Sequence, residues 1–268
     1  MSLRAGPTKY IIRFLRLTRL ALHLVCAVAI VAACFPFYND AKRMEWVRRW
    51  SARLLAILAV RMEVSGMLPG AGVAPAMIVA NHVSWLDIFA INAVREVRFV
   101  AKSEIRRWPV FGWLCAQGSA LFVERARRDH AALINRQMAA ALRRGELFVL
   151  FPEGYTSAGD VVLPFHASLL QPALECDAML YPVAIRYMRA DGSLCSEADY
   201  AGDKSMLGSL LLMLTQPAIF AQLQFLPALI SAGKHRRELA YESSRLIAGT
   251  LGVPTPRRRA GTTVRPHG

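Results

Sequence analysis

Short apolar runs alternate with amphipathic stretches along most of the chain. Apolar runs bounded by Gly, Pro or Asn are typical of buried strands, and such runs occur at 76–80, 97–101, 120–124, 147–151, 180–187 and 219–226. Helical spacing and capping residues predict helices among them, at 86–94, 129–144 and 236–251. A further apolar run at 206–214 is too short to span a membrane. Strands that alternate with helices favour an α/β fold with a largely buried sheet.

The longest apolar run, 20–37, lies near the N-terminus and is followed by a helical pattern over 41–60. The run is close to the lower limit of the ~17–25 residues that a membrane-spanning helix needs. The second pattern carries Trp46 and Trp50 among arginines, which suits the membrane–water interface. Basic residues flank the run on both sides, so the positive-inside rule gives no clear orientation. We therefore expect a membrane-associated helical hairpin seated in the cytoplasmic leaflet.

These patterns divide the chain into three parts. Residues 1–64 are expected to form N-terminal helices that are embedded in the membrane or lie at its interface. The segment 67–75 is rich in Gly, Pro and Ala and leads into a catalytic domain over 65–252. The basic tail, 253–268, is expected to be disordered.

Two other interpretations of the N-terminal run stay open. Basic residues before an apolar segment also describe a signal peptide, and the segment 31–34 resembles a lipoprotein cleavage box. The long basic leader and the amphipathic helix that follows directly argue against export. An ordinary core helix is the other alternative, which the density of flanking arginines disfavours.

The composition narrows the class of partner. The chain has 33 Lys and Arg against 19 Asp and Glu, a net charge of +14, and 54% of its residues are hydrophobic. A basic chain binds polyanions, and the high apolar content favours an anionic membrane surface over nucleic acid. The five cysteines form no Cys-x-x-Cys pair and no metal-ligand spacing, so we expect reduced thiols and no metal site. These points indicate a protein of the inner (cytoplasmic) membrane whose catalytic domain faces the cytosol.

The candidate chemistry starts where the first buried strand ends. His82 follows the strand 76–80, at the carboxyl end where open α/β sheets place their active sites. Ser84 and Asp87 have the capping-box spacing that opens the helix 86–94. With His82 in the loop and Asp87 in the first helical turn, a carboxylate can fix the imidazole tautomer and support its positive charge. In the alternative interpretation, Asp87 only caps the helix and His82 is an ordinary loop histidine.

Other polar residues also stand where predicted strands end. The segment 151–157 (FPEGYTS) follows a strand; its proline stops the ladder, its glycine permits a turn with exposed N–H groups, and hydroxyls follow. Such a turn can receive an anionic or polyol group. Taken singly, a plain turn or a solvated surface residue explains each of these positions. The candidate binding residues at strand ends are Lys102, Arg125, Glu153, Gly154, Tyr155 and Thr156.

Four short blocks occur in a fixed order along the chain: Asn81-His82-x-x-x-x-Asp87, Arg125 at a strand end, Phe-Pro-Glu-Gly at 151–154, and Tyr181-Pro182-Val183. Each block is weak alone, but together they are specific. The combination resembles the 1-acylglycerol-3-phosphate acyltransferase family over roughly residues 40–250. The resemblance implies an α/β fold with a glycerolphosphate-acyltransferase-like mixed β-sheet flanked by helices.

The resemblance also implies a role for each block. His82 would be the general base that removes a proton from the acceptor hydroxyl as it attacks an acyl thioester, and Asp87 would orient the imidazole. Pro182 marks the block that is usually linked to the acyl side. The implied co-substrate is acyl-CoA or acyl carrier protein, with no metal and no other cofactor. The residues implied to hold the glycerol phosphate are Lys102, Arg125, Glu153 and Gly154.

The sequence departs from the family pattern after Phe-Pro-Glu-Gly. Tyr155 and Thr156 stand where the family commonly has Thr and Arg, and His166 stands where it often has Lys; a missing arginine removes a bidentate phosphate contact. The segments 161–170 and 200–207 also resemble a subgroup that acylates lyso-ornithine lipid, which carries no phosphate. We expect a membrane-bound O-acyltransferase whose lysophospholipid acceptor is 1-acyl-sn-glycerol 3-phosphate, with lyso-ornithine lipid as the nearest alternative. A non-enzymatic binder of membranes or nucleic acid is a more distant one.

Overall fold

The computed structural model describes residues 7–70, 75–118, 120–123, 128–202 and 204–254. The first half of the chain forms α1 (Pro7–Cys34), η1 (Phe35–Phe37), α2 (Asp40–Ile57), β1 (Val60–Gly66), β2 (Ala76–Ala80), α3 (Leu86–Val94), β3 (Arg98–Lys102), η2 (Ser103–Arg107), α4 (Phe111–Gln117) and β4 (Leu121–Val123). The second half forms α5 (Arg128–Arg143), β5 (Phe148–Leu150), η3 (Ala167–Leu170), α6 (Gln171–Glu175), β6 (Met179–Met188), α7 (Met206–Met213), β7 (Ile219–Phe225), β8 (Leu229–Ile230) and α8 (Arg236–Leu251).

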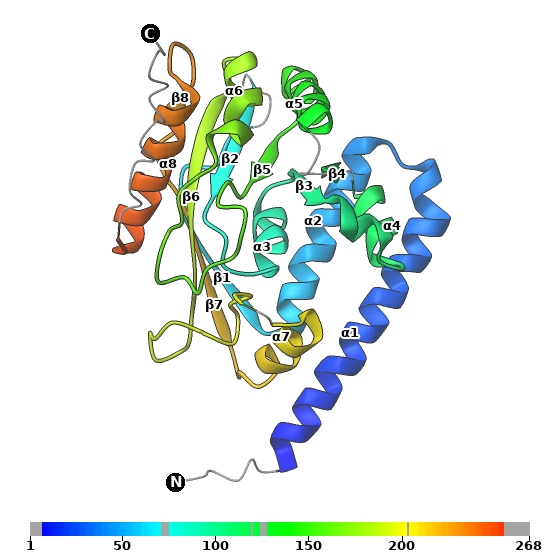
Figure 1. Ribbon diagram of the computed structural model, residues 1–268. Coiled ribbons are helices and arrows are strands. Elements are labelled where there is room, and N and C mark those ends of the chain that lie inside the picture. Colours follow the sequence, from blue (N-terminus) through cyan, green and yellow to red (C-terminus); the bar gives the residue numbers. More distant parts are fainter. Residues whose placement is uncertain (1–6, 71–74, 119, 124–127, 203, 255–268) are drawn as a thin grey trace.

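A mixed sheet forms the centre of the molecule (Figure 1). Its strand order within the described residues is β1-β7-β6-β2-β5-β3-β4, and β8 pairs with β6. The pairs β1/β7, β2/β5, β2/β6, β3/β4 and β3/β5 are parallel, whereas β6 runs antiparallel to β7 and β8. Because β2, β5 and β3 are parallel neighbours, their carboxyl ends meet at one edge of the sheet.

Helices cover both faces of this sheet, and alternate residues of β2 point to opposite faces. Ile78 belongs to a buried apolar cluster that includes residues of α2, α3 and α7. Met77 belongs to a second cluster, which includes residues of α5, α6 and α8. All five residues of β2 are buried, as expected for a central strand with apolar cover on both sides. The predicted fold class, a mixed sheet flanked by helices, is therefore confirmed.

The N-terminal helix α1 runs along the outside of the molecule and projects away from the sheet (Figure 1). The stretch Tyr10–Phe37 is long and apolar enough to cross a membrane, and only 22% of its most apolar window is buried in the protein. A core helix of a soluble protein is mostly buried, so this exposure argues against the core-helix interpretation. Helix α2, in contrast, buries Leu54 and Leu55 in the core of the domain.

The strands predicted from apolar runs correspond to β2, β3, β4, β5, β6 and β7, with ends displaced by at most one residue. One prediction was wrong: residues 60–66 form the strand β1, and the helix predicted over 41–60 ends at Ile57. The domain boundary drawn after residue 64 therefore falls inside a strand of the sheet. Most of the predicted disordered tail, from residue 255 onward, lies outside the described residues.

Candidate active site

The predicted site residues lie where neighbouring parallel strands end. His82 follows β2, and Glu153 follows β5, its parallel neighbour. Lys102 is the last residue of β3, which pairs with β5; its side chain is outside the part of the structure that is described. Arg125 also lies outside the described residues. The topology therefore brings His82, Glu153 and the end of β3 to one edge of the sheet.

His82 and Asp87 meet as the spacing predicted. The imidazole Nδ1 lies 2.7 Å from Asp87 Oδ2. A carboxylate can only accept, so Nδ1 carries the proton of this hydrogen bond and Nε2 is left as the basic nitrogen. The imidazole also stacks on the Phe151 ring, with ring centroids 4.2 Å apart and planes 18° from parallel. These two contacts fix both the tautomer and the plane of the imidazole, which is what a general base requires.

Asp87 caps a helix and pairs with the histidine at the same time. Its carboxylate is fully buried, and Oδ2 accepts the backbone N–H groups of Val83 and Ser84 at 2.8 and 2.9 Å. These bonds hold the loop at the start of α3, as in a capping box. Asp87 therefore combines the capping contacts with the histidine pairing, because the same oxygen also accepts the hydrogen bond of His82 Nδ1.

The second oxygen of Asp87 has a partner from a distant strand. The hydroxyl of Tyr187, at the end of β6, donates to Asp87 Oδ1 over 2.7 Å. Tyr187 is buried, and burial together with the nearby Asp87 charge raises its pKa well above the ordinary value. The phenol therefore stays protonated and remains a donor, so that both oxygens of Asp87 are held in place.

Glu153 holds the loop that carries His82. Its side chain is only 2% exposed; Oε2 accepts the His82 backbone N–H at 2.5 Å, and Oε1 accepts the Leu163 N–H at 2.7 Å. Burial raises the pKa of this carboxyl to about 8, against the opposing effect of the two N–H donors. Because both oxygens face the protein backbone, the arrangement makes Glu153 a residue that positions the His82 loop.

The remaining predicted residues have different surroundings. Gly154 lines a cavity beside His82 and has a φ of +82°, a left-handed conformation that favours glycine. Tyr155 is 75% exposed, and the Thr156 hydroxyl donates to the Tyr200 carbonyl over 2.5 Å. Pro182 is buried within β6, beside β2, and is not among the residues that line the cavity. Direct contact between these residues and a substrate stays a prediction.

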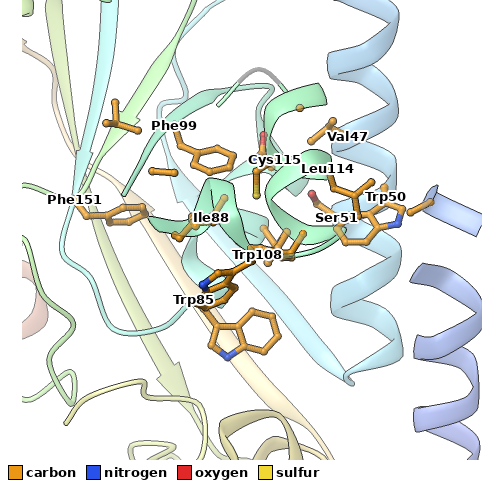
Figure 2. Close-up of a pocket in the computed structure, with 18 of the residues that line it drawn as sticks. Val47, Trp50, Ser51, Trp85, Ile88, Phe99, Trp108, Leu114, Cys115 and Phe151 are labelled. Atoms are coloured by element: carbon orange, nitrogen blue, oxygen red, sulfur yellow. The ribbon is translucent and has the colours of Figure 1, made fainter. Parts of the chain in front are cut away.

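An apolar cavity of about 360 Å³ adjoins His82. Figure 2 shows Phe151 on one side of it and Trp50 and Ser51 of α2 on the other, with Ile88, Leu114 and Cys115 between them. Burial raises the pKa of the Cys115 thiol to about 11, so this thiol is neutral and adds to the apolar lining. The volume lies within the ~300–1,000 Å³ range of ligand pockets. Aromatic residues that line the cavity are Phe35, Trp46, Trp50, Trp85, Phe89, Phe99, Trp108, Phe111, Phe151 and Tyr200.

Sequence reasoning gave no role to two residues that support the site. Asn81 is buried directly after β2, and its amide both donates to the Ile185 carbonyl and accepts the Ile185 N–H, at 2.9 and 2.8 Å. It therefore extends the pairing between β2 and β6 by one position and fixes the start of the His82 loop. The signal was available, since a polar residue at the end of a buried strand needs hydrogen-bond partners. The Tyr187 hydroxyl gave no such signal, because its partner is 100 positions away in the chain.

Comparison with known proteins agrees with this geometry. Residues 61–186 match the Acyltransferase family model. A lyso-ornithine lipid O-acyltransferase from Pseudomonas aeruginosa is 38% identical over 221 residues, which cover 81% of this chain and 84% of that protein. A 1-acyl-sn-glycerol-3-phosphate acyltransferase from Neisseria meningitidis is 40% identical over 150 residues, covering 55% of this chain and 58% of that protein.

A solved structure has the same fold. The crystal structure of the 1-acyl-sn-glycerophosphate (LPA) acyltransferase PlsC from Thermotoga maritima superposes with a TM-score of 0.64 at 19% identity. The match covers 90% of this chain and 96% of that one. The resemblance first read from four short blocks is thereby confirmed, and so is the class of enzyme. The chain belongs to the acyltransferase family, together with the enzymes that acylate lysophospholipids and lyso-ornithine lipid.

Proposed function

We propose that this protein transfers a fatty acyl group from a thioester donor, acyl-CoA or acyl carrier protein, to the free hydroxyl of a lysolipid at a membrane surface. One observation carries the proposal: an imidazole oriented by a buried carboxylate adjoins a large apolar cavity. The imidazole supplies base catalysis, and the cavity offers an apolar environment to a fatty chain.

The reaction needs only the groups at this edge of the sheet. Nε2 of His82 takes the proton from the acceptor hydroxyl as its oxygen attacks the thioester carbonyl carbon. The carbon–sulfur bond of the tetrahedral intermediate then breaks, and the proton on Nε2 passes to the leaving thiolate. During these steps Asp87 stabilises the imidazolium through the Nδ1 hydrogen bond. General base help of this kind is worth ~10²–10⁴-fold in rate.

The acyl chain is the natural occupant of the cavity. Its lining comes from apolar and aromatic side chains of α1, α2, α3, α4 and the strand ends (Figure 2). Burying a methylene group there contributes ~0.8 kcal/mol. The thioester carbonyl of a chain held in this way lies near His82, because Phe151, which stacks on the imidazole, also lines the cavity.

Two acceptors fit the family. 1-Acyl-sn-glycerol 3-phosphate is the acceptor expected from the four blocks, and its acylation gives phosphatidic acid. Lyso-ornithine lipid is the second candidate, and two observations favour it: Tyr155 and Thr156 replace the Thr-Arg pair common in the family, and the Thr156 hydroxyl is already bound to the Tyr200 carbonyl. Relatives with that name also match over a larger share of the chain.

The membrane location belongs to the same proposal. The exposed apolar surface of α1 supports attachment to lipid, and the basic residues of α1 and α2 support an anionic leaflet. We place the protein at the inner (cytoplasmic) membrane with its catalytic domain in the cytosol, where acyl-CoA and acyl carrier protein are made.

An acyl-transfer assay tests the proposal. Purified protein in lipid vesicles is offered lysophosphatidate and lyso-ornithine lipid side by side, each with acyl-CoA and with acylated carrier protein. We expect ester formation with at least one acceptor, and a loss of at least ~10²-fold in His82→Ala. His235→Ala is the matched control, because His235 caps the distant helix α8. No ester with any pair of substrates would refute the proposed function, and turnover of the aminolipid alone would assign the acceptor.

A further inference from the structure

Helix α7 presents leucine side chains to its surroundings. Leu207, Leu211 and Leu212 are 64%, 48% and 43% exposed. They lie on one eight-residue helix whose described side chains are all uncharged. Isolated exposed leucines are ordinary on a soluble protein, but three on two turns of one helix form a contiguous apolar patch, which marks a contact surface.

The opposite face of α7 touches the active-site region. Ser209 is fully buried, and its Oγ accepts the indole N–H of Trp85 over 3.2 Å. Trp85 stands three positions after His82 and lines the cavity, as does Met206 at the start of α7. The inner face of α7 is therefore part of the wall around the cavity, while its outer face carries the leucines.

The end of α7 is joined to the N-terminal helix. The guanidinium of Arg16, on α1, donates to the carbonyls of Gln216 and Pro217 at 2.8 and 3.0 Å, a few residues beyond the end of α7. Figure 1 shows α7 beside the N-terminal half of α1. That part of α1 is itself apolar and exposed: Ile11, Phe14 and Leu15 are 58%, 69% and 53% exposed. Two helices with exposed apolar side chains are therefore joined to each other through Arg16.

We propose that α7 is a second lipid-contacting element, which inserts Leu207, Leu211 and Leu212 into the same leaflet as α1. The occupant of the patch is lipid because the patch adjoins the helix whose length and composition suit a bilayer. Arg13 and Arg19 lie one helical turn to either side of Arg16 on α1 and suit anionic headgroups. This inference rests on the proposed membrane location, and it brings the part of the cavity wall formed by α7 close to the lipid that supplies the acceptor.

Site-specific photocrosslinking tests the contact directly. The photoreactive residue p-benzoylphenylalanine replaces Leu207 or Leu211, one at a time, in the full-length protein bound to phosphatidylethanolamine–phosphatidylglycerol vesicles. Val25 on α1, 66% exposed, is the positive control, and Arg245 on the exposed side of α8 is the negative control. We expect lipid adducts from Val25, Leu207 and Leu211 but not from Arg245, detected by mass spectrometry. All four positions are on the surface, so the fold is preserved.

The other outcomes separate the two proposals. Adducts from Val25 without adducts from α7 would overturn the inference and leave the membrane location intact. Adducts from α7 to a second protein molecule, or equal lipid labelling at Arg245, would overturn it as well. No lipid adduct even at Val25 would refute the membrane location itself.

A kinetic comparison gives an independent readout. In the double variant Leu207→Ser/Leu211→Ser, we expect KM for an acceptor embedded in vesicles to rise roughly tenfold with kcat little changed, because apolar area buried in lipid is lost. For a short-chain acceptor dispersed as monomers in water, the double variant should have the same KM as the parent protein. Ile230→Ser, which removes an exposed isoleucine from β8, is the matched control and should leave both KM values unchanged. Equal losses with the dispersed acceptor would show a structural defect and contradict the inference.

Discussion

Replacement of Asp87 by Asn removes the charge next to His82 while it keeps the shape of the side chain. Asp87 Oδ2 accepts three N–H groups, and Oδ1 accepts the Tyr187 hydroxyl. The amide oxygen of Asn can take the Oδ2 position, and its NH₂ group can donate to the phenol oxygen, because a phenol both donates and accepts. The variant therefore retains the helix cap and loses the carboxylate charge, together with the acceptor of the Tyr187 hydroxyl proton.

The size of the effect follows from the separation of the charges. Nδ1 and Oδ2 are 2.7 Å apart, and two unit charges about 4 Å apart attract by ~4 kcal/mol at an effective dielectric of ~20. Since ~1.4 kcal/mol is a factor of ten, we expect Asp87→Asn to lower kcat by ~10³-fold. The free energy of unfolding should fall by only ~1–2 kcal/mol, because the N–H groups keep an oxygen acceptor, although an uncharged one, and the Tyr187 hydroxyl accepts where it previously donated.

The assay measures kcat for acyl transfer at saturating donor and acceptor, together with thermal unfolding of the same samples. Asp177→Asn is the matched control: Asp177 is exposed, its φ of +49° suits Asn, and it does not line the cavity. A folded Asp87→Asn protein that loses less than tenfold in kcat would refute stabilisation of the imidazolium by the Asp87 charge. In that case Asp87 would serve the protein as a helix cap alone.

Three further predictions follow from the same site. Tyr187→Phe leaves Asp87 Oδ1 without its donor, so kcat should fall by ~10-fold and the unfolding free energy by ~1–3 kcal/mol; unchanged kcat would contradict a positioning role. Glu153→Gln turns an NH₂ group toward a backbone N–H, which should cost ~1–3 kcal/mol at acid pH. The pKa of Glu153 is raised from 4.5 to about 8, so its stabilising contribution is full below pH 4.5 and is lost as the pH rises through about 8. When the free energy of unfolding is measured across this pH range, the Gln variant should lack this decrease. Gly154→Ala places a side chain at φ +82°, which should cost ~1–2 kcal/mol, visible as a lower Tm, whereas an unchanged Tm would count against a strained turn.

The strand ends could be predicted because the central strands are short, apolar and bounded by residues that stop a ladder. β2 is buried at every position, so its apolar run coincides with the strand. The same signal placed His82 and Glu153 just past β2 and β5, and the parallel pairing of these strands then brought the two residues to one edge. Local spacing was also enough to bring His82 to Asp87, since both lie within one loop and helical turn.

The strand β1 was missed although its sequence, VRMEVSG, alternates apolar and polar residues. Only Leu58 and Ala59 separate it from α2. The predicted helix was therefore extended to residue 60, where the alternating pattern begins. β1 is also an edge strand with mostly exposed residues, and its pairing with β7 joins positions about 160 apart. Long-range pairing of this kind is a tertiary effect that local patterns do not contain.

The partners of polar side chains were harder to predict than their positions. Contact between Glu153 and the acceptor stays a prediction, whereas its bonds to the backbone N–H groups of His82 and Leu163 were not foreseen. These hydrogen-bond partners depend on how the turn after β5 packs against the loop after β2, and the spacing of residues in the sequence does not describe that packing. The same is true of Tyr187, which reaches Asp87 from the far end of β6, and of the cavity, which needs α1, α2 and α4 together.

Single-turnover acyl transfer by purified wild-type protein and His82→Ala in the same lipid vesicles tests the general-base role of His82 most directly. We expect ester formation on the lysolipid hydroxyl by the wild type and a loss of at least ~10²-fold in the variant, with vesicle binding unchanged because α1 is intact. Ester formation at the wild-type rate in folded, vesicle-bound His82→Ala protein would contradict that role.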